Sequence, residues 1–108
     1  MRQNNNTGKG EKITIHVEIT IAKLIPKFLK NMQNNITAIQ KALRQSDFET
    51  IQTLGHNMKG SGGSIGFDTV SDIGKSLEQA AKNQNSEEIM KQIDILSTYL
   101  ERVEIVYE

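Results

Sequence analysis

Apolar side chains recur at spacings of three and four residues along most of this chain, and this periodicity is its strongest constraint on a fold. Such spacing lines one face of an α-helix, so each stretch that carries it predicts an amphipathic helix. Four stretches do so, within residues 24–47, 48–66, 68–85 and 86–108. Their apolar positions are Ile25, Phe28, Leu29, Met32, Ile36, Ile39 and Leu43, then Phe48, Ile51, Leu54 and Met58, then Val70, Ile73, Leu77 and Ala81, and lastly Ile89, Met90, Ile93, Leu96, Leu100 and Val103. Joined by short connections, they predict an all-α fold, an antiparallel up-down-up-down four-helix bundle.

Polar residues and a proline mark where these helices begin. Pro26 suits the first turn of the first long helix, because its missing N–H would have no partner there, and any helix before it should be short and separate. Ser46 or Asp47, Asp68 and Ser86 are expected to cap the next three helices with side-chain oxygens.

The N-terminal part of the sequence does not share the helical period. Residues 1–12 offer almost no apolar side chain to bury and are expected to form a disordered arm, followed by one domain over residues 13–108. The segment "ITIHVEI" alternates as a strand does, with Ile13, Ile15, Val17 and Ile19 on one side and His16 facing solvent. Since no second strand follows, we expect an extended lead-in packed along the helices.

Composition excludes several classes of function. The 108 residues fit one domain, and their 13 basic and 13 acidic residues are interspersed, so nucleic acid is not an expected partner. Apolar runs are too short to insert in a membrane. The absence of cysteine excludes thiolate metal sites and gives no sign of an oxidising compartment, so a cytoplasmic location is the expectation.

The stretch "HNMKGSGGSIG", residues 56–66, places four glycines where the periodicity predicts a helix. Each glycine costs a helix interior about 1 kcal/mol relative to alanine, which indicates a compensating purpose. On a helical projection His56 lies about 150° from the centre of the apolar face and therefore points to solvent. Lys59, Gly60 and Gly63 share its side of the helix.

This arrangement suits a nucleophilic histidine. A neutral imidazole has one ring nitrogen with a free lone pair, and an ordinary histidine is mostly neutral near pH 7. Missing Cβ atoms around His56 would let a partner approach the ring closely. Lys59, one turn later, could offset the charge of a transferred phosphoryl group.

The pattern H-x-x-K-G-x-G-G-x-x-G from His56 to Gly66 resembles that of the histidine-containing phosphotransfer (HPt) domain. The flanking segments "LIPKFLKNM", "DFETIQTLGH" and "LEQAAK" resemble the same family, in its small stand-alone bacterial form. The resemblance covers residues 13–108 and implies the same four-helix bundle that the periodicity predicts.

The resemblance also implies an activity. His56 would accept a phosphoryl group from the aspartate of one receiver domain and pass it to another, as a phosphotransfer intermediate without autokinase activity in two-component signalling. Lys59 would stabilise the phosphoryl group and Gly60 would keep the surface open. Glu78 is a candidate to accept a hydrogen bond from Nδ1 of the ring, which would leave Nε2 as the attacking atom.

Partners and cofactors follow from the same resemblance. Response-regulator receiver domains are the expected partners, with a hybrid sensor kinase as a further one, and the protein itself is expected to be a monomer. The receiver would supply Mg²⁺, so the chain needs no metal or cofactor of its own. The expected receiver docking face surrounds His56 and consists of Gln52, Asn57, Gly60, Ser61, Gly63 and Ser64.

Three other functions compete with this one. A phosphate-binding glycine loop requires a preceding strand and a different order of lysine and glycine. The dimerisation domain of a histidine kinase usually has an acidic residue directly after its histidine, where this chain has Asn57. A helical module that binds receivers without being phosphorylated stays open as the alternative.

Overall fold

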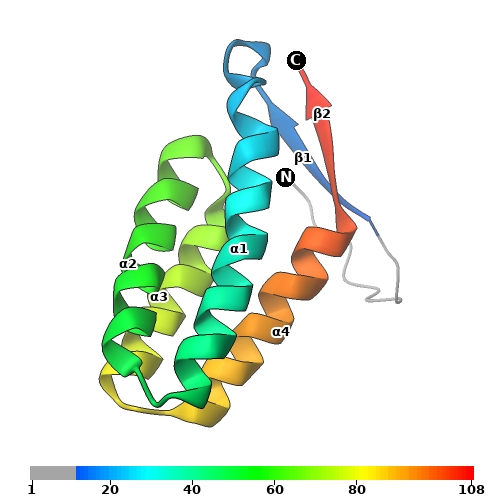
Figure 1. Cartoon of the computed structure of the whole chain (residues 1–108). Coiled ribbons are helices and arrows are strands. Elements are labelled where there is room, and N and C mark those ends of the chain that lie inside the picture. The colour runs from blue at the N-terminus through cyan, green and yellow to red at the C-terminus, as the bar shows by residue number, and fades with distance from the viewer. Residues whose placement is uncertain (1–11) are drawn as a thin grey trace.

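The structure, a computed structural model, describes residues 12–108 and consists mainly of four helices packed side by side (Figure 1). In chain order the elements are β1 (Ile13–Val17), η1 (Ile19–Ile21), α1 (Leu24–Arg44), α2 (Phe48–Ile65), α3 (Asp68–Lys82), α4 (Ser86–Arg102) and β2 (Val103–Tyr107). Successive helices run in opposite directions, and α1 and α4 also touch, which closes the ring. The predicted four-helix bundle is confirmed. The arm predicted to be disordered lies, apart from Lys12, outside the described residues.

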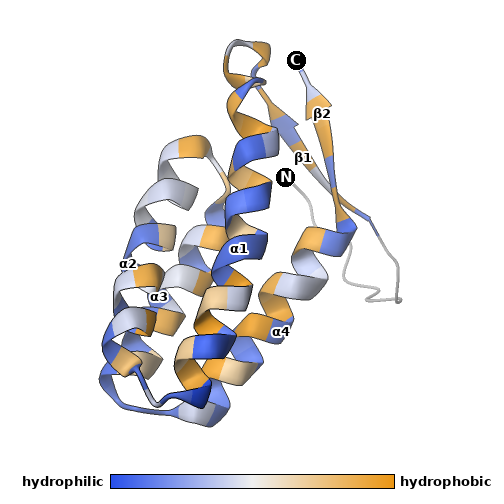
Figure 2. Ribbon diagram, viewed as in Figure 1, coloured by the Kyte–Doolittle hydropathy of each residue, from blue (hydrophilic) through white to orange (hydrophobic). Residues whose placement is uncertain are grey.

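The core of the bundle is built from the predicted apolar positions. Figure 2 shows hydrophobic and hydrophilic residues succeeding one another along each helix, as the periodicity requires. Among the fully buried side chains are Ile25, Ile39, Ile51, Met58, Val70, Leu77, Ile89 and Leu96. Phe67, between α2 and α3, is also fully buried and stacks at a tilt on Phe28 of α1, with ring centroids 4.9 Å apart. Met90 is the exception, because its side chain is 57% exposed where the stripe predicted burial.

The helix starts differ from the prediction by one residue in two cases. Asp47 caps α2 as expected, since its Oδ1 accepts the backbone N–H of Thr50 at 3.2 Å. The cap of α4 is Asn85 rather than Ser86, and its Oδ1 accepts the N–H of Glu88 at 3.1 Å. Asp68 does not cap α3 but is its first residue, where its negative charge faces the positive end of the helix dipole.

The region before α1 matches the prediction in part. The 3₁₀-helix η1 is the short, separate helix expected before Pro26, and Pro26 lies in the first turn of α1. The segment from Ile13 to Val17 is extended as expected, but the absence of a partner strand was a wrong expectation. It pairs in parallel with β2, in a register that sets Ile13 opposite Val103 and Val17 opposite Tyr107.

The two strands join the ends of the described chain. Val103 and the residues after it were expected to continue the last helix, yet α4 ends at Arg102. The segment "VEIVY" is rich in β-branched residues, so a strand suits it as well as a helix does. Val17 is buried, and Ile15 and Ile105 are half-buried against the bundle.

Backbone hydrogen bonds extend this pairing beyond the strands. The N–H of Glu108 donates to the carbonyl of Val17, and the N–H of Ile19 donates to the carbonyl of Glu108, both at 2.8 Å. The side chain of His16 is half exposed, near the solvent as expected, and its Nδ1 lies 2.6 Å from Oε2 of Glu108. The first and last described elements therefore form one small sheet at one end of the bundle (Figure 1).

Candidate functional site

His56 lies in the middle of α2 and points away from the bundle. Its side chain is 63% exposed, whereas Met58, two residues later, and Ile51, on the turn before, are fully buried. The outward orientation predicted from the helical projection is confirmed. The apolar face of α2 fixes this orientation, because rotating the helix to bury His56 would expose Ile51 and Met58.

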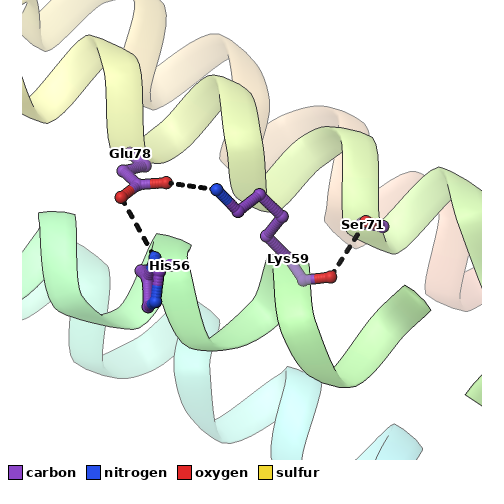
Figure 3. Close-up of polar contacts among 4 residues, drawn as sticks. All are labelled: His56, Lys59, Ser71 and Glu78. Atoms are coloured by element: carbon purple, nitrogen blue, oxygen red, sulfur yellow. Dashed lines mark hydrogen bonds and ion pairs between the residues drawn. The ribbon is translucent and has the colours of Figure 1, made fainter. Parts of the chain in front are cut away.

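One carboxylate on the neighbouring helix contacts both His56 and Lys59 (Figure 3). Oε2 of Glu78 on α3 lies 3.2 Å from Nδ1 of His56, and its Oε1 lies 3.2 Å from Nζ of Lys59. Glu78 is only 15% exposed. Hydrogen bonding to Lys59 lowers the pKa of Glu78, with a smaller contribution from His56, so the carboxylate is ionised at neutral pH.

Glycines bring α2 and α3 close enough for these contacts. A Cβ atom at Gly74 of α3 would lie 2.5 Å from the backbone nitrogen of Lys59, and one at Gly55 of α2 would lie 2.7 Å from that of Glu78. Gly62 is equally tight, since its Cβ would lie 2.7 Å from the nitrogen of Ser71. The two backbones therefore meet directly along a glycine seam formed by Gly55, Gly62 and Gly74.

A hydrogen bond between α2 and α3 adds to this seam. Oγ of Ser71 on α3 donates to the backbone carbonyl of Lys59 at 2.9 Å (Figure 3). The bond holds the backbone of Lys59 in place, while the only contact of its ammonium group described here is the ion pair with Glu78.

The four glycines of residues 56–66 have different roles. The sequence analysis explained them all by close approach of a partner to His56, and the structure supports this for only two of them. Nothing lies within 4 Å of a Cβ built at Gly60, and only Ser71 Oγ, at 3.7 Å, lies near one at Gly63, so these two do leave open space beside His56. Gly62 instead packs against α3. Gly66 ends α2 with φ of +90°, a conformation that favours glycine.

Sequence reasoning missed two members of the glycine seam, Gly55 and Gly74. A signal for one of them was present, because Gly55 and Gly62 are seven residues apart and so lie on the same face of α2 as Met58. No comparable sequence pattern marks Gly74. Only its position against the backbone of Lys59 shows why a side chain is excluded there.

The residues predicted to form the docking face surround His56 with mostly exposed side chains. Asn57, Gly60, Ser61, Gly63 and Ser64 are exposed. Gln52 is half-buried. These residues have small or uncharged polar side chains, and the nearby Lys59 supplies a positive charge.

Neither a metal cluster nor a membrane span is found in the described part of the chain. Across residues 12–108, no three histidine or acidic side chains gather as ligands for a metal ion. None of the helices there is both long and apolar enough to cross a membrane.

Comparison with known proteins decides which family has this arrangement. The sequence pattern of the Hpt domain matches residues 23–105. The chain belongs to the Hpt domain family. The match includes all four helices, with His56, Lys59 and Glu78, and leaves β1 outside it. No curated protein and no solved structure matches the chain significantly.

Membership of this family gives the general function. Hpt domains carry out histidine phosphotransfer in phosphorelay signalling, where they interact with receiver domains. The glycine-rich segment is thus part of a helical phosphotransfer unit and not of a nucleotide-binding loop, since it lies within α2 and no strand precedes it directly.

Proposed function

We propose that this Hpt domain carries a phosphoryl group on His56 between two receiver domains. One observation supports this above all: the ring of His56 is 63% exposed while its Nδ1 is held by Glu78. With Nδ1 engaged, the ring presents its other nitrogen, Nε2, to an approaching partner.

The proposed transfer needs no reactant other than His56 and the aspartyl phosphate of the receiver. While Nδ1–H donates a hydrogen bond to Glu78, the lone pair of Nε2 attacks phosphorus in the aspartyl phosphate of the donor receiver. An N–P bond forms, the P–O bond to the aspartate breaks, and that carboxylate leaves with the electron pair. The ring keeps its Nδ1 proton and gains positive charge, which the carboxylate of Glu78 offsets at close range. Transfer to the second receiver reverses these steps.

Lys59 is proposed to stabilise the phosphoryl group. In the structure its ammonium is bound to Oε1 of Glu78, on the same side of α2 as the His56 ring. Its flexible stem can turn the ammonium from this carboxylate to the phosphoryl oxygens, because only its backbone is held by Ser71. Glu78 thus keeps the ammonium of Lys59 near the ring until the phosphoryl group, with its greater negative charge, is present.

The receiver completes the site in this proposal. We propose that it docks over Gln52, Asn57, Gly60, Ser61, Gly63 and Ser64 and brings the aspartate and its Mg²⁺. The open space at Gly60 and Gly63 supports close approach. The location we propose is the cytoplasm, where the ATP that ultimately supplies the phosphoryl group is available.

Label transfer from a phosphorylated receiver tests this function. The wild-type protein should acquire an acid-labile, base-stable phosphate from at least one receiver of the host, and His56→Gln should acquire none. His16→Gln is the matched control, because it removes the second histidine of the chain without touching the site, and it should label normally. If the wild type binds receivers yet never acquires label, the alternative of a docking module without phosphorylation is correct.

A further inference from the structure

Three groups of Lys59 contact α3, and the residues that they contact lie on one face of that helix. Oγ of Ser71 donates to the backbone carbonyl of Lys59 at 2.9 Å (Figure 3). The backbone nitrogen of Lys59 lies 2.5 Å from where a Cβ of Gly74 would be, and its ammonium lies 3.2 Å from Oε1 of Glu78. Positions 71, 74 and 78 are three and four residues apart, so they form one stripe of α3. A single face of α3 therefore holds Lys59 at both its backbone and its side chain.

Ser71 is itself held in place by buried neighbours. It lies in the first turn of α3, where its backbone N–H donates to the carbonyl of Phe67 at 3.1 Å. Phe67 and Val70 are fully buried in the core, and Ser71 is half-buried. Because close-packed side chains leave little room for movement, these neighbours fix the position from which the hydroxyl of Ser71 reaches Lys59.

The segment of α2 that follows Lys59 has little helical preference of its own. Gly60, Gly62 and Gly63 occupy three of the next four positions, and glycine has the lowest helix propensity of any residue except proline. In a regular α-helix the N–H of Gly63 bonds the carbonyl of Lys59. A carbonyl oxygen accepts two hydrogen bonds, so the hydroxyl of Ser71 adds a second donor to the same group. The bond from Ser71 therefore ties the start of this glycine-rich segment to α3.

We propose that Ser71 is a positioning residue for phosphoryl transfer and acts through Lys59. The inference rests on the proposed function, in which the ammonium of Lys59 turns from Glu78 to the phosphoryl oxygens. Once it has turned, the contact with Glu78 no longer holds Lys59, whereas the bond from Ser71 to its backbone does. That bond keeps Lys59 at the distance from His56 at which its charge stabilises the phosphoryl group, a stabilisation that weakens with small displacements.

Single-turnover transfer from a phosphorylated receiver tests this role. Ser71→Ala should lower the maximal rate of transfer to His56 by about three- to tenfold, as the loss of one hydrogen bond implies, and should leave the receiver concentration at half-maximal rate unchanged. Ser76→Ala is the matched control, because Ser76 lies on the same helix about 140° around from Ser71, and it should transfer as the wild type does. A wild-type rate in Ser71→Ala, or a change in the half-maximal concentration alone, overturns the proposal.

A double variant separates positioning from a general effect on the fold. In a Lys59→Ala background, Ser71→Ala should cause no further loss of rate, because the group that Ser71 positions is then missing. A structural role of Ser71 would slow transfer by the same factor with and without Lys59, and that result overturns the proposal. Circular dichroism of each variant shows that the helices are retained.

Phosphoramidate makes the test independent of any receiver. This small donor phosphorylates an imidazole and releases ammonia, since its own P–N bond breaks as the bond to the ring forms. In a His16→Gln background, where His56 is the remaining histidine, Ser71→Ala should again slow labelling by about three- to tenfold. Equal labelling with and without the hydroxyl overturns the positioning role. Slower labelling of Ser71→Ala in a protein that no receiver phosphorylates supports the positioning role and rejects the proposed function.

Discussion

At the scale of single residues, Glu78 accounts for the geometry of the whole site. Its two oxygens hold a ring nitrogen of His56 and the ammonium of Lys59, each at 3.2 Å. In the proposed reaction the carboxylate therefore has two effects: its hydrogen bond orients the ring, and its negative charge offsets the positive charge that the ring gains on phosphorylation. A replacement that keeps the hydrogen bond but removes the charge, compared with one that removes both, separates the two effects.

We expect Glu78→Ala to slow phosphoryl transfer to His56 by about 10- to 100-fold, the usual effect of losing a group that orients a reactive side chain. Glu78→Gln should fall between this variant and the wild type, because its amide oxygen still accepts from Nδ1 while its charge is gone. Single-turnover transfer from a phosphorylated receiver measures both. Equal rates for all three proteins would show that Glu78 has no part in the reaction.

Tyr99 gives a second prediction at this scale, concerning stability. Its hydroxyl is buried and has no hydrogen-bond partner among the described residues, and burial, with a smaller effect of Asp68, raises its pKa to about 12. Because the folded pKa exceeds the unfolded value of 10.0, the free energy of unfolding should fall as the pH rises from about 10 to about 12.

Tyr99→Phe should abolish that alkaline loss and, at neutral pH, should raise the free energy of unfolding by up to about 1 kcal/mol, since no unpaired hydroxyl is then buried. Urea unfolding at neutral pH and near the upper end of this range measures the difference. Tyr107→Phe is the control, because Tyr107 is 43% exposed. A variant clearly less stable than the wild type at neutral pH would mean that the hydroxyl has a partner in solution.

At the scale of elements, the glycine seam between α2 and α3 sets the spacing on which the site depends. Gly74→Ala would place a Cβ 2.5 Å from the backbone nitrogen of Lys59, and backbone cannot move aside as a side chain does. We expect a loss of about 1–3 kcal/mol in the free energy of unfolding, as for other overpacked cores.

Gly60→Ala is the matched control for this substitution. It adds the same methyl group to a helical glycine with nothing within 4 Å, so helix propensity alone should stabilise the protein by about 0.5–1 kcal/mol. Urea unfolding compares the two variants. Similar changes in both would show that the helices do not pack as closely as the structure has them.

The elements also show which parts of the fold a sequence can predict. The helices and the outward face of His56 follow from local periodicity, which each stretch carries by itself. The β1–β2 pair could not be foreseen in this way, because Val103 fits the helical period of α4 as well as the alternation of a strand. Only pairing with β1, where Ile13 lies opposite Val103 although it is far away in sequence, decides between them. The close approach at Gly74 likewise depends on a neighbour that the sequence does not name.

At the scale of the whole molecule, the small sheet joins the two ends of the described chain. Removing residues 103–108 would expose Val17 and Ile15 and break the backbone bonds to Glu108. Burial of two to three aliphatic side chains is worth about 1.5–3 kcal/mol each, so we expect a loss of a few kcal/mol. Thermal unfolding followed by circular dichroism should show a lower midpoint with the helical signal retained. An unchanged midpoint would show that the bundle does not need the sheet.

We propose that the whole molecule acts as a four-helix bundle that presents Nε2 of His56 to its partners. Nitrogen NMR of the ring of His56, before and after phosphorylation by a receiver, tests this most directly. We expect the phosphoryl group to be bonded to Nε2 while Nδ1 stays protonated and hydrogen-bonded to Glu78. A phosphoryl group on Nδ1, or a ring unchanged after exposure to phosphorylated receivers, would contradict it.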